Sequence, residues 1–499
     1  MKRNKIALLS MLSFLLIFTA CDNAFELDIN RTPDYPATAS TPLLVSSGVT
    51  WSSSQLGSDV QLLGAFWSQH YTQNNSSNQY KTIDSYNLTN GTLSRVWSSM
   101  YSGALADFKI AISQAEKEKA WSYWTAAKVM SAFDYFILSS LYEKIPFSEA
   151  LQGDVNVTPK FDEGKEVNAG ILKMLDEVIA KKSDALAAEN MKTNDMVFGG
   201  DINKWIQFAK SLKLKVLMRE FDLNKTAITA LLNENDLLSS DAKLAKFIDQ
   251  ENYSNPLYEN DRRKLNTANN IRGSATLITF LNTYSDPRVS IFFEPVTKNI
   301  NGTPSAANVY RGLDQGSADF YTQLQFPTEA HSRALLAATD AVYFMSAAEV
   351  AFLKAEAYAR LNDVANAKSN YDEGVKLAFS RWGLNGTSFI SAGGAYEFDA
   401  TNLDSMLKSI ITQKWIASTR CQAWDAFFDI NRTGIPALGN KYTGDAGYVV
   451  GTLTPSMYSV LVAGDFPRRL LFPSSSSDNN PNTPKVSDYP VQKKMWWHK

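Results

Sequence analysis

Cysteine is scarce in this sequence, which has only two among its 499 residues. Small disulfide scaffolds depend on many cysteines, whereas a chain of this length can bury a large apolar core. One of the two, Cys21, directly follows an apolar N-terminal segment, and if it is lipidated Cys421 has no disulfide partner. We therefore expect a fold that is stabilised by its buried core and not by disulfides.

An excess of charge of one sign is also absent, since 49 Lys and Arg residues nearly balance 51 Asp and Glu residues. Such a chain has no long-range field that would attract a polyanion, so we expect no nucleic-acid partner. The three histidines are too scattered for a helical metal pair, and the motifs CxxC, HExxH, GxGxxG, GxxxxGK(S/T) and GxSxG are missing. We expect no cofactor and no zinc or redox centre. The EF-hand pattern is absent too, although the acidic stretch 154–162 still allows calcium binding.

Long apolar runs are confined to the N-terminus. Three basic residues precede an apolar run over residues 6–20, which has the length of a secretory signal but is too short to span a bilayer. The sequence Phe18-Thr19-Ala20-Cys21 resembles a bacterial lipobox, with Phe18 in place of the usual Leu. We predict a signal peptide over residues 1–20 and a lipid on Cys21. The alternative is an ordinary secretory signal that leaves Cys21 as a free or disulfide-bonded residue.

The segment from residue 21 to 41 is predicted to be an acylated N-terminus and tether. Its second half is rich in Pro, Ser and Thr, which is typical of an extended linker. No later stretch approaches the roughly eighteen consecutive apolar residues of a membrane-spanning helix. We therefore expect the lipid to be the only attachment to a membrane.

Helical periodicity dominates the rest of the chain. In residues 202–220, apolar side chains recur at helical spacing behind a capping residue, Asp201. Strand-like alternation is scarce, so the predicted fold class is mainly α. The clearest predicted helices cover residues 93–117, 121–141, 167–186, 202–220, 347–361, 364–378 and 403–418.

A predicted helical hairpin over residues 345–378 carries a repeat pattern. Ser346 and Glu349 form a capping-box pair at the start of its first helix. Small residues on both helices allow two antiparallel helices to approach closely. The alternative is a generic helical hairpin. The positions typical of a tetratricopeptide repeat are Ala357, Tyr358, Asn362, Ala367, Tyr371 and Gly374, with Asn362 in place of the usual turn glycine.

In residues 411–438, a QKW helix precedes an acidic-aromatic helix and an R-x-G-x-P turn. This order resembles the C-terminal signature of the SusD/RagB family of outer-membrane lipoproteins, and other segments along the chain are similar to the same family. Residues 344–358 are similar to its repeat helix, and residues 466–482 to its proline-arginine-aromatic stretch. Cys421 and Asn431 depart from the usual residues. The matching signature positions are Gln413, Lys414, Trp415, Trp424, Asp425, Arg432, Gly434 and Pro436.

The resemblance implies a SusD-like helical domain over residues 42–499, built on tetratricopeptide-like helix pairs with long loops. It also implies a non-catalytic protein that binds oligosaccharides or peptides at the cell surface and delivers them to a SusC-like TonB-dependent barrel in the outer membrane. Three acidic residues look like the surface-export tag of such lipoproteins, although a solvated linker would look the same. They are Asp22, Glu26 and Asp28.

The ligand-contacting aromatics of the family lie in variable loops, so candidate site residues come from sugar chemistry alone. A sugar presents hydroxyls and flat C–H faces, which suit aromatic rings and carboxamides. Two regions, 64–80 and 308–325, combine these side chains. The alternatives are core packing for Trp67 and Tyr71 and an ordinary polar loop for the amides. The predicted ligand-binding residues are Trp67, His70, Tyr71, Asn74, Asn75 and Tyr80 in the first region and Tyr310, Arg311 and Tyr321 in the second.

Four other tryptophans are expected to have structural roles. We interpret Trp415 and Trp424 as core residues, and Trp496 and Trp497 as part of a docking tail. Two other functions stay open at this point. An envelope glycosidase would need two carboxylates that face each other across a cleft, and a helical-repeat scaffold would assemble envelope proteins without binding nutrients.

Overall fold

The computed structural model describes residues 39–75, 77–265, 270–317 and 327–499. Residues Thr41–Lys499 form one compact unit. The predicted signal peptide, the lipidation site Cys21 and the candidate Tyr321 lie outside the described residues. These three therefore stay predictions, as does the domain boundary at residue 42.

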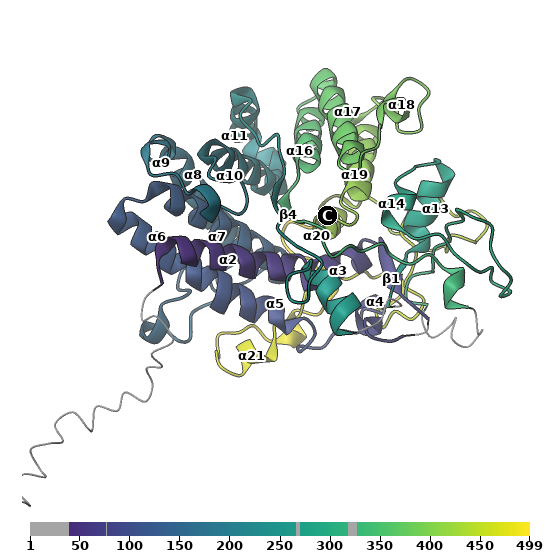
Figure 1. Cartoon of the computed structure of the whole chain (residues 1–499), viewed down its shortest axis with the longest axis horizontal. Coiled ribbons are helices and arrows are strands. Elements are labelled where there is room, and N and C mark those ends of the chain that lie inside the picture. The colour runs from purple at the N-terminus through teal and green to yellow at the C-terminus, as the bar shows by residue number, and fades with distance from the viewer. Residues whose placement is uncertain (1–38, 76, 266–269, 318–326) are drawn as a thin grey trace, which may run out of the picture. The chain divides into compact units, whose positions relative to one another are not determined.

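The mainly α fold class is confirmed. Within the described residues, the strands form two short antiparallel ribbons, one of β1 (Tyr71–Gln73) with β3 (Ile271–Gly273) and one of β2 (Ala242–Leu244) with β4 (Val342–Met345). Helices make up most of the remaining elements, and the helix-rich part lies on one side of the loop-rich part in Figure 1.

The first half of the unit is built from paired helices. A π-helical segment, Ser99–Leu105, joins α5 to α6, so the predicted helix over 93–117 is nearly continuous. The predicted helix over 167–186 is divided into α8 and α9, and α10 ends in a short 3-10 turn. The helices are α2 (Thr41–Leu56), α3 (Asp59–Trp67), α4 (Lys81–Asp84), α5 (Ser94–Ser98), α6 (Ala106–Glu118), α7 (Trp121–Tyr142), α8 (Gly164–Ala180), α9 (Lys182–Ala187), α10 (Ile202–Leu217) and α11 (Phe221–Glu234).

The second half continues with short helices in long loops and then returns to helix pairs. The three helices predicted over 347–361, 364–378 and 403–418 are α16, α17 and α19. The helices are α12 (Pro256–Tyr258), α13 (Ala275–Thr283), α14 (Val289–Phe292), α16 (Ala347–Arg360), α17 (Val364–Ser380), α18 (Thr387–Ile390), α19 (Leu403–Ala417), α20 (Ala423–Thr433) and α21 (Ser474–Ser477).

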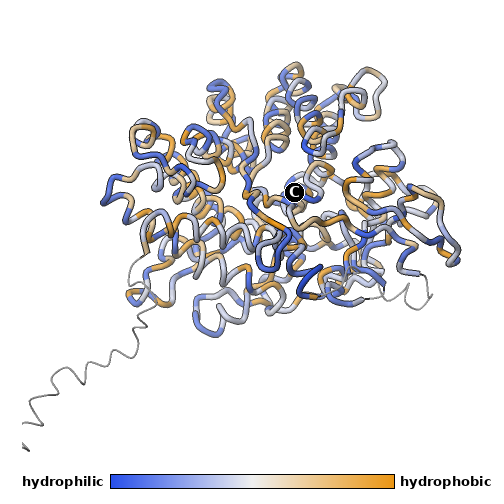
Figure 2. Tube along the Cα trace, viewed as in Figure 1, coloured by the Kyte–Doolittle hydropathy of each residue, from blue (hydrophilic) through white to orange (hydrophobic). Residues whose placement is uncertain are grey.

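Helix α7 lies at the centre of the first half. Nearly all of its residues are buried, because it packs against α2, α6, α8 and α10. A helix that is apolar on all sides can be stable only when neighbours cover it completely. Figure 2 shows the most hydrophilic segments on outer turns and loops, whereas an apolar stretch runs through β4 in the interior.

The hairpin of α16 and α17 has the close packing expected of a tetratricopeptide-like unit. A Cβ atom at Gly374 would lie 2.7 Å from the ring of Phe352, which is itself fully buried. The turn residue Asn362 has φ of 62°, a left-handed conformation that Asn tolerates better than most residues. This explains how Asn can stand at the usual glycine position.

The predicted helix caps are confirmed in one case and corrected in the other. Asp201 accepts the N–H of Lys204 at 3.3 Å, as expected for the start of α10. Ser346 accepts the N–H of Glu349 at 3.2 Å, but Glu349 does not return a bond to Ser346. The Glu349 carboxylate instead binds Lys215 of α10 at 2.6 Å, because it belongs to a buried ion network.

That buried ion network connects α10, α16, α19 and α20. Each of its positive groups lies within 2.8 Å of a carboxylate oxygen, so the buried charges compensate one another. Most of the family-like signature therefore lies in the core. The network consists of Lys215, Glu349, Glu356, Lys414, Asp425, Asp429 and Arg432.

The four tryptophans singled out from the sequence have structural surroundings. Trp415 and Trp424 are each 1% exposed, so the prediction that they are core residues is confirmed. Trp415 donates its Nε1–H to the carbonyl of Ser68 at 2.8 Å. In the C-terminal tail, Trp497 is buried beneath Arg219, and Trp496 packs beside Gly164, so the tail is held against the helical core.

Candidate functional site

Three loop segments that are distant in sequence meet at Asp84. Its carboxylate accepts the N–H groups of Gln73 at 3.1 Å and Gly316 at 3.0 Å. The hydroxyl of Thr72 donates to the same carboxylate at 2.8 Å, and Ser456 Oγ donates to the Asp84 carbonyl at 2.7 Å. Asp84 therefore fastens the β1 strand to two loops of the second half of the chain.

Gln69 makes a second connection between the same loops. Its Oε1 accepts the N–H of Thr454 at 2.9 Å, and its Nε2 donates to the Thr454 carbonyl at 2.6 Å. Thr276, at the start of α13, also donates to Oε1. Burial raises the pKa of Asp84 to about 7, although the hydrogen bonds it accepts oppose the shift. The side chains of Asp84 and Gln69 are both buried, so we interpret them as structural supports for the loops that they join.

Three residues that the sequence predicts as ligand contacts lie in the core. Trp67, His70 and Tyr71 are each 0% exposed. The ring centroid of Trp67 lies 5.0 Å from that of Phe427, and its Nε1–H donates to the carbonyl of Ile83. Burial lowers the pKa of His70 to about 3, so the imidazole is neutral at physiological pH. A side chain without exposed surface has no access to a ligand in this structure, which favours the core alternative.

The loop after β1 is likewise folded inward. Asn74 and Asn75 are 0% and 6% exposed, and Tyr80 is 9% exposed. The phenol of Tyr80 donates to Oδ1 of Asp261 at 3.0 Å, while its N–H donates to Oε1 of Gln73 at 2.6 Å. These side chains are covered by protein in this structure, and a ligand platform at these residues stays a prediction.

Tyr310 and Arg311, in contrast, keep part of their surface exposed. The carbonyl of Tyr310 accepts Nδ2–H of Asn282 at 3.0 Å, and the Arg311 guanidinium donates to the Ala330 carbonyl at 2.9 Å. These bonds fix the backbone and leave the phenol of Tyr310 available. Partial burial raises the pKa of that phenol above its usual value, so it stays protonated and can donate a hydrogen bond.

A loop that the sequence-based prediction missed lies beside the Tyr310 loop. It covers residues 438–466 and is joined to the earlier loop where the N–H of Met457 donates to the carbonyl of Gln315 at 2.8 Å. It carries Tyr442 and Tyr448, both half-buried. Burial raises the pKa of both phenols, and the nearby Asp314 carboxylate contributes to the shift. Asp314 lies in the same loop as Tyr310, and the Met457–Gln315 hydrogen bond joins that loop to the loop that carries the two rings.

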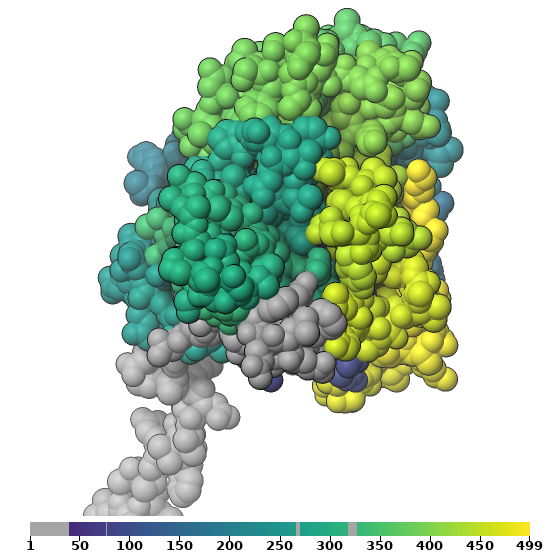
Figure 3. Space-filling model, turned by 90° about the vertical axis from the view of Figure 1, so that its right-hand side faces the viewer, coloured from purple at the N-terminus to yellow at the C-terminus, as the bar shows by residue number. Residues whose placement is uncertain are grey.

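We call the surface that carries Tyr310, Arg311, Tyr442 and Tyr448 the tyrosine face. In Figure 3 the surface is hollowed between the teal segment that includes the Tyr310 loop and the yellow-green segment that includes residues 438–466. A cavity of about 770 Å³ opens along the second segment, lined by aromatic, hydroxyl and amide side chains. They include Tyr86, Asn440, Tyr442, Thr454, Ser456 and Ser459.

The sequence of this second loop contains a signal that could have identified it as a binding loop. Residues 438–466 contain five glycines and three tyrosines and lack helical periodicity. Long glycine-rich loops are frequent places for binding residues.

The described part of the chain contains no cluster of three or more His, Cys, Asp or Glu side chains that could hold a metal ion. No helix in that part is long and apolar enough to cross a membrane.

The tyrosine face is suited to a neutral, hydroxylated ligand. Phenols offer both a flat apolar surface and a hydroxyl, and Arg311 adds donors for oxygen atoms. The half-buried acid near the rings, Asp314, carries oxygens that can accept hydrogen bonds from hydroxyls. Such a surface can bind a carbohydrate by stacking and hydrogen bonding.

Comparison with known proteins gives a consistent result. A family model of SusD-like proteins, described as starch-binding and associating with the outer membrane, matches residues 49–455. No curated protein matches the sequence. Among solved structures, a SusD homolog from Bacteroides uniformis aligns with a TM-score of 0.73 and 23% identity, over 92% of this chain and 98% of that chain.

Two further solved structures share the fold. A chitin-binding SusD homolog from Flavobacterium johnsoniae aligns with a TM-score of 0.72 and 19% identity, over 91% of this chain and 98% of that chain. A SusD/RagB family protein from Bacteroides thetaiotaomicron aligns with a TM-score of 0.68 and 21% identity, over 92% and 99% of the two chains. At these identities the alignments establish the fold.

Proposed function

The chain belongs to the SusD-like family, and from this premise we propose that it is a non-catalytic receptor that binds oligosaccharides at the tyrosine face. The observation that carries the proposal is the combination of the family match with half-exposed tyrosines on two connected loops. The chitin-binding homolog with the same fold supports a carbohydrate as the ligand class.

The chemistry of the tyrosine face supports a role in capture. Stacking of a sugar ring on a phenol uses the C–H face of the sugar, while the phenol and guanidinium groups bind its hydroxyls. The loops that carry these groups are fixed by the buried side chains of Asp84 and Gln69. A rigid binding surface loses little conformational entropy when the ligand binds.

We propose delivery to a SusC-like TonB-dependent barrel as the second part of this function. The family description places its members at the outer membrane, which supports such a partner. The lipid on Cys21 would hold the receptor at that membrane, with the surface leaflet favoured by Asp22, Glu26 and Asp28. Replacement Cys21→Ser should release the protein from the membrane fraction, whereas retention of this variant would contradict a lipid anchor.

Other candidate functions lead to different results in the same assay. The purified chain is incubated with a panel of neutral oligosaccharides, including chitin and starch fragments, and bound sugar and reaction products are measured. A receptor retains at least one sugar saturably and leaves it intact. Cleavage would favour a glycosidase, retention of peptides alone would favour peptide capture, and no retention of any ligand would favour a scaffold.

The test of the site uses two alanine variants with a matched control. Tyr310→Ala and Tyr442→Ala should each weaken retention about tenfold, because aromatic anchors carry much of the energy of a binding site. Tyr253→Ala serves as the control, since Tyr253 is 61% exposed on a different loop. Equal loss in all three variants, or no loss in the first two, would contradict the tyrosine face as the binding surface.

A further inference from the structure

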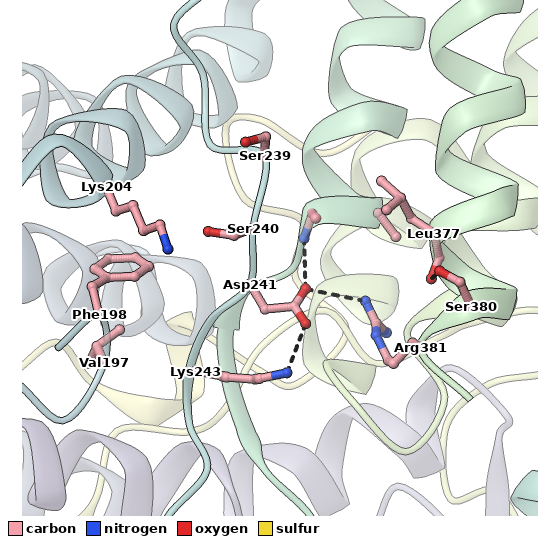
Figure 4. A pocket seen from close by; sticks show the side chains of 12 residues that line it. Val197, Phe198, Lys204, Ser239, Ser240, Asp241, Lys243, Leu377, Ser380 and Arg381 are labelled. Carbon is pink, nitrogen blue, oxygen red and sulfur yellow. Dashed lines mark hydrogen bonds and ion pairs between the residues drawn. The ribbon is translucent and has the colours of Figure 1, made fainter. Parts of the chain in front are cut away.

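A second pocket lies between the two sets of helix pairs, on elements that do not contribute to the tyrosine face. It has a volume of about 510 Å³, within the usual range for small-molecule sites. Its walls come from the loop before α10, the first turn of α10, the segment that leads into β2, the start of α16 and the end of α17. Figure 4 shows these elements on opposite sides of the pocket.

The pocket is lined by more positive than negative charge. Lys204, Lys243 and Arg381 line it together with a single carboxylate, that of Asp241. Asp241 is already engaged, because its Oδ1 accepts the N–H of Ala347 at 3.0 Å and its Oδ2 lies 3.0 Å from Nζ of Lys243. The lining therefore has a net charge of about two positive units that the protein does not neutralise there.

Lys204 is the cation that remains available. Within the described part of the chain, its ammonium makes no ion pair or hydrogen bond. In Figure 4 the side chain extends from α10 toward the hydroxyl of Ser240 on the opposite wall, and Phe198 lies beside it. An ammonium, a seryl hydroxyl and an aromatic ring thus converge on one space.

Arg381 supplies a second, deeper positive group. Its side chain is 6% exposed, and its Nη1 donates to the carbonyl of Ala417 at 3.1 Å. Its Nη2 lies 4.0 Å from Oδ1 of Asp241, while its Nε has no hydrogen-bond partner in the described part of the chain. A buried guanidinium with an unused donor increases the local preference for an anion.

We propose that this pocket is a second binding site, specific for the carboxylate of an acidic sugar such as a uronic acid. The carboxylate is bound by Lys204 and the adjacent serines, Ser239 and Ser240, and the C–H face of the sugar packs on Phe198. A bare inorganic anion would use the charge but not the aromatic ring or most of the volume. This site is independent of neutral-sugar capture at the tyrosine face.

The experiment compares sugars that differ only in the carboxylate. Titration calorimetry is carried out with the methyl glycosides of glucuronic and galacturonic acid, and with the corresponding neutral methyl glucoside and galactoside. At least one acidic glycoside should bind at least tenfold more tightly than its neutral counterpart. Absence of binding by both acidic glycosides, or equal binding of an acidic and a neutral glycoside, would overturn the proposal.

Variants locate the site. Lys204→Gln should weaken binding of the acidic glycoside at least tenfold, and Lys204→Arg should retain most of it, because the charge and donors are preserved. Gln at this position keeps the N–H that Asp201 caps, so α10 should form normally. The matched control is Lys117→Gln, since Lys117 is an exposed lysine on α6.

Two further results would also overturn the site. Unchanged affinity in Lys204→Gln would place any binding elsewhere, and acetate or phosphate binding as tightly as the acidic glycoside would show a general anion site without sugar recognition. Retention of neutral oligosaccharides by Lys204→Gln is measured in parallel. Weaker binding of the acidic glycoside alone supports the second site. A failure of the proposed function would appear separately, as no retention of neutral oligosaccharides by the parent protein.

Discussion

Nζ of Lys414 lies 2.6 Å from Oδ2 of Asp429, and both side chains are more than nine-tenths buried. Asp425 lies on the other side of the same ammonium at 2.8 Å. Burial would lower the pKa of Lys414, but the carboxylates of Asp425 and Asp429 hold it above its usual value. The lysine of the family-like signature is therefore a structural cation that compensates two buried acids.

Removal of this cation should destabilise the fold severely. Lys414→Met removes the ammonium that lies beside the buried carboxylates of Asp425 and Asp429. Breaking a buried ion network in this way costs about 3–5 kcal/mol. The measurement is the urea midpoint of unfolding, followed by circular dichroism. Lys408→Met is the matched control, because Lys408 is exposed on the same helix and its replacement should change stability by less than about 0.5 kcal/mol. Similar midpoints for the two variants would contradict the structural role.

The stability of the protein should depend on Asp134 between about pH 4 and pH 8. Burial raises the pKa of Asp134 to about 8, although Ser52 donates a hydrogen bond to it. In the unfolded chain an aspartate has a pKa of about 3.9, so within this window only the folded state holds the proton. The free energy of unfolding therefore falls as pH rises, by up to about 1.4 kcal/mol per pH unit from this group.

Asp134→Asn should remove that part of the pH dependence. Urea midpoints at pH 5 and pH 8 are compared for the parent and the variant, and the decrease at pH 8 should be smaller in the variant. Asp154→Asn is the control, because Asp154 is exposed in a loop and should leave the dependence unchanged. An equal decrease in the parent and in Asp134→Asn would show that the buried carboxyl does not carry the effect.

The α16–α17 hairpin should not tolerate a methyl group at Gly374. Alanine is the better helix former by about 1 kcal/mol, but its Cβ would meet the ring of Phe352 at 2.7 Å. Overpacking of a buried core typically costs about 1–3 kcal/mol, so Gly374→Ala should lower the thermal midpoint. The second change Phe352→Leu should recover part of the loss, because it removes the ring. A Gly374→Ala variant as stable as the parent would contradict the close packing.

Tyr80 should affect stability and not ligand binding. Tyr80→Phe removes the hydrogen bond to Asp261 and leaves a buried carboxylate oxygen with fewer donors, at a cost of about 1–3 kcal/mol. Its affinity for any sugar retained by the parent should stay unchanged. Calorimetric titration at a temperature where both proteins are folded separates the two effects, and a weakened affinity with normal stability would return Tyr80 to the binding site.

The fold was largely predictable from the sequence because helical periodicity and the signature segments are local. Trp415, Trp424 and the α16–α17 hairpin are located as expected, since a stripe of apolar residues and small contact residues specifies packing directly. The role of Glu349 was not predictable, because its partner Lys215 is 134 residues away in sequence. Periodicity contains no information about which distant charge a buried carboxylate meets.

The candidate site was predictable only in part. Residues 64–80 have the aromatic and amide side chains expected of a sugar-binding loop. They are nevertheless buried, because β1 pairs with β3 and Asp84 binds the backbone of a distant loop that covers them. Composition cannot distinguish a surface loop from one that other loops cover. Tyr442 and Tyr448 were missed for a related reason, because the loop that carries them meets the earlier loop through contacts between residues distant in sequence, such as Met457 and Gln315.

Calorimetric titration of the double variant Tyr310→Ala/Tyr442→Ala is the sharpest test of whether neutral oligosaccharides bind at the tyrosine face. The sugar is one that the parent retains, and the thermal midpoint of the variant is measured first to confirm folding. We expect a folded double variant whose affinity is at least a hundredfold below that of the parent. A folded double variant with the parent's affinity would contradict binding at the tyrosine face.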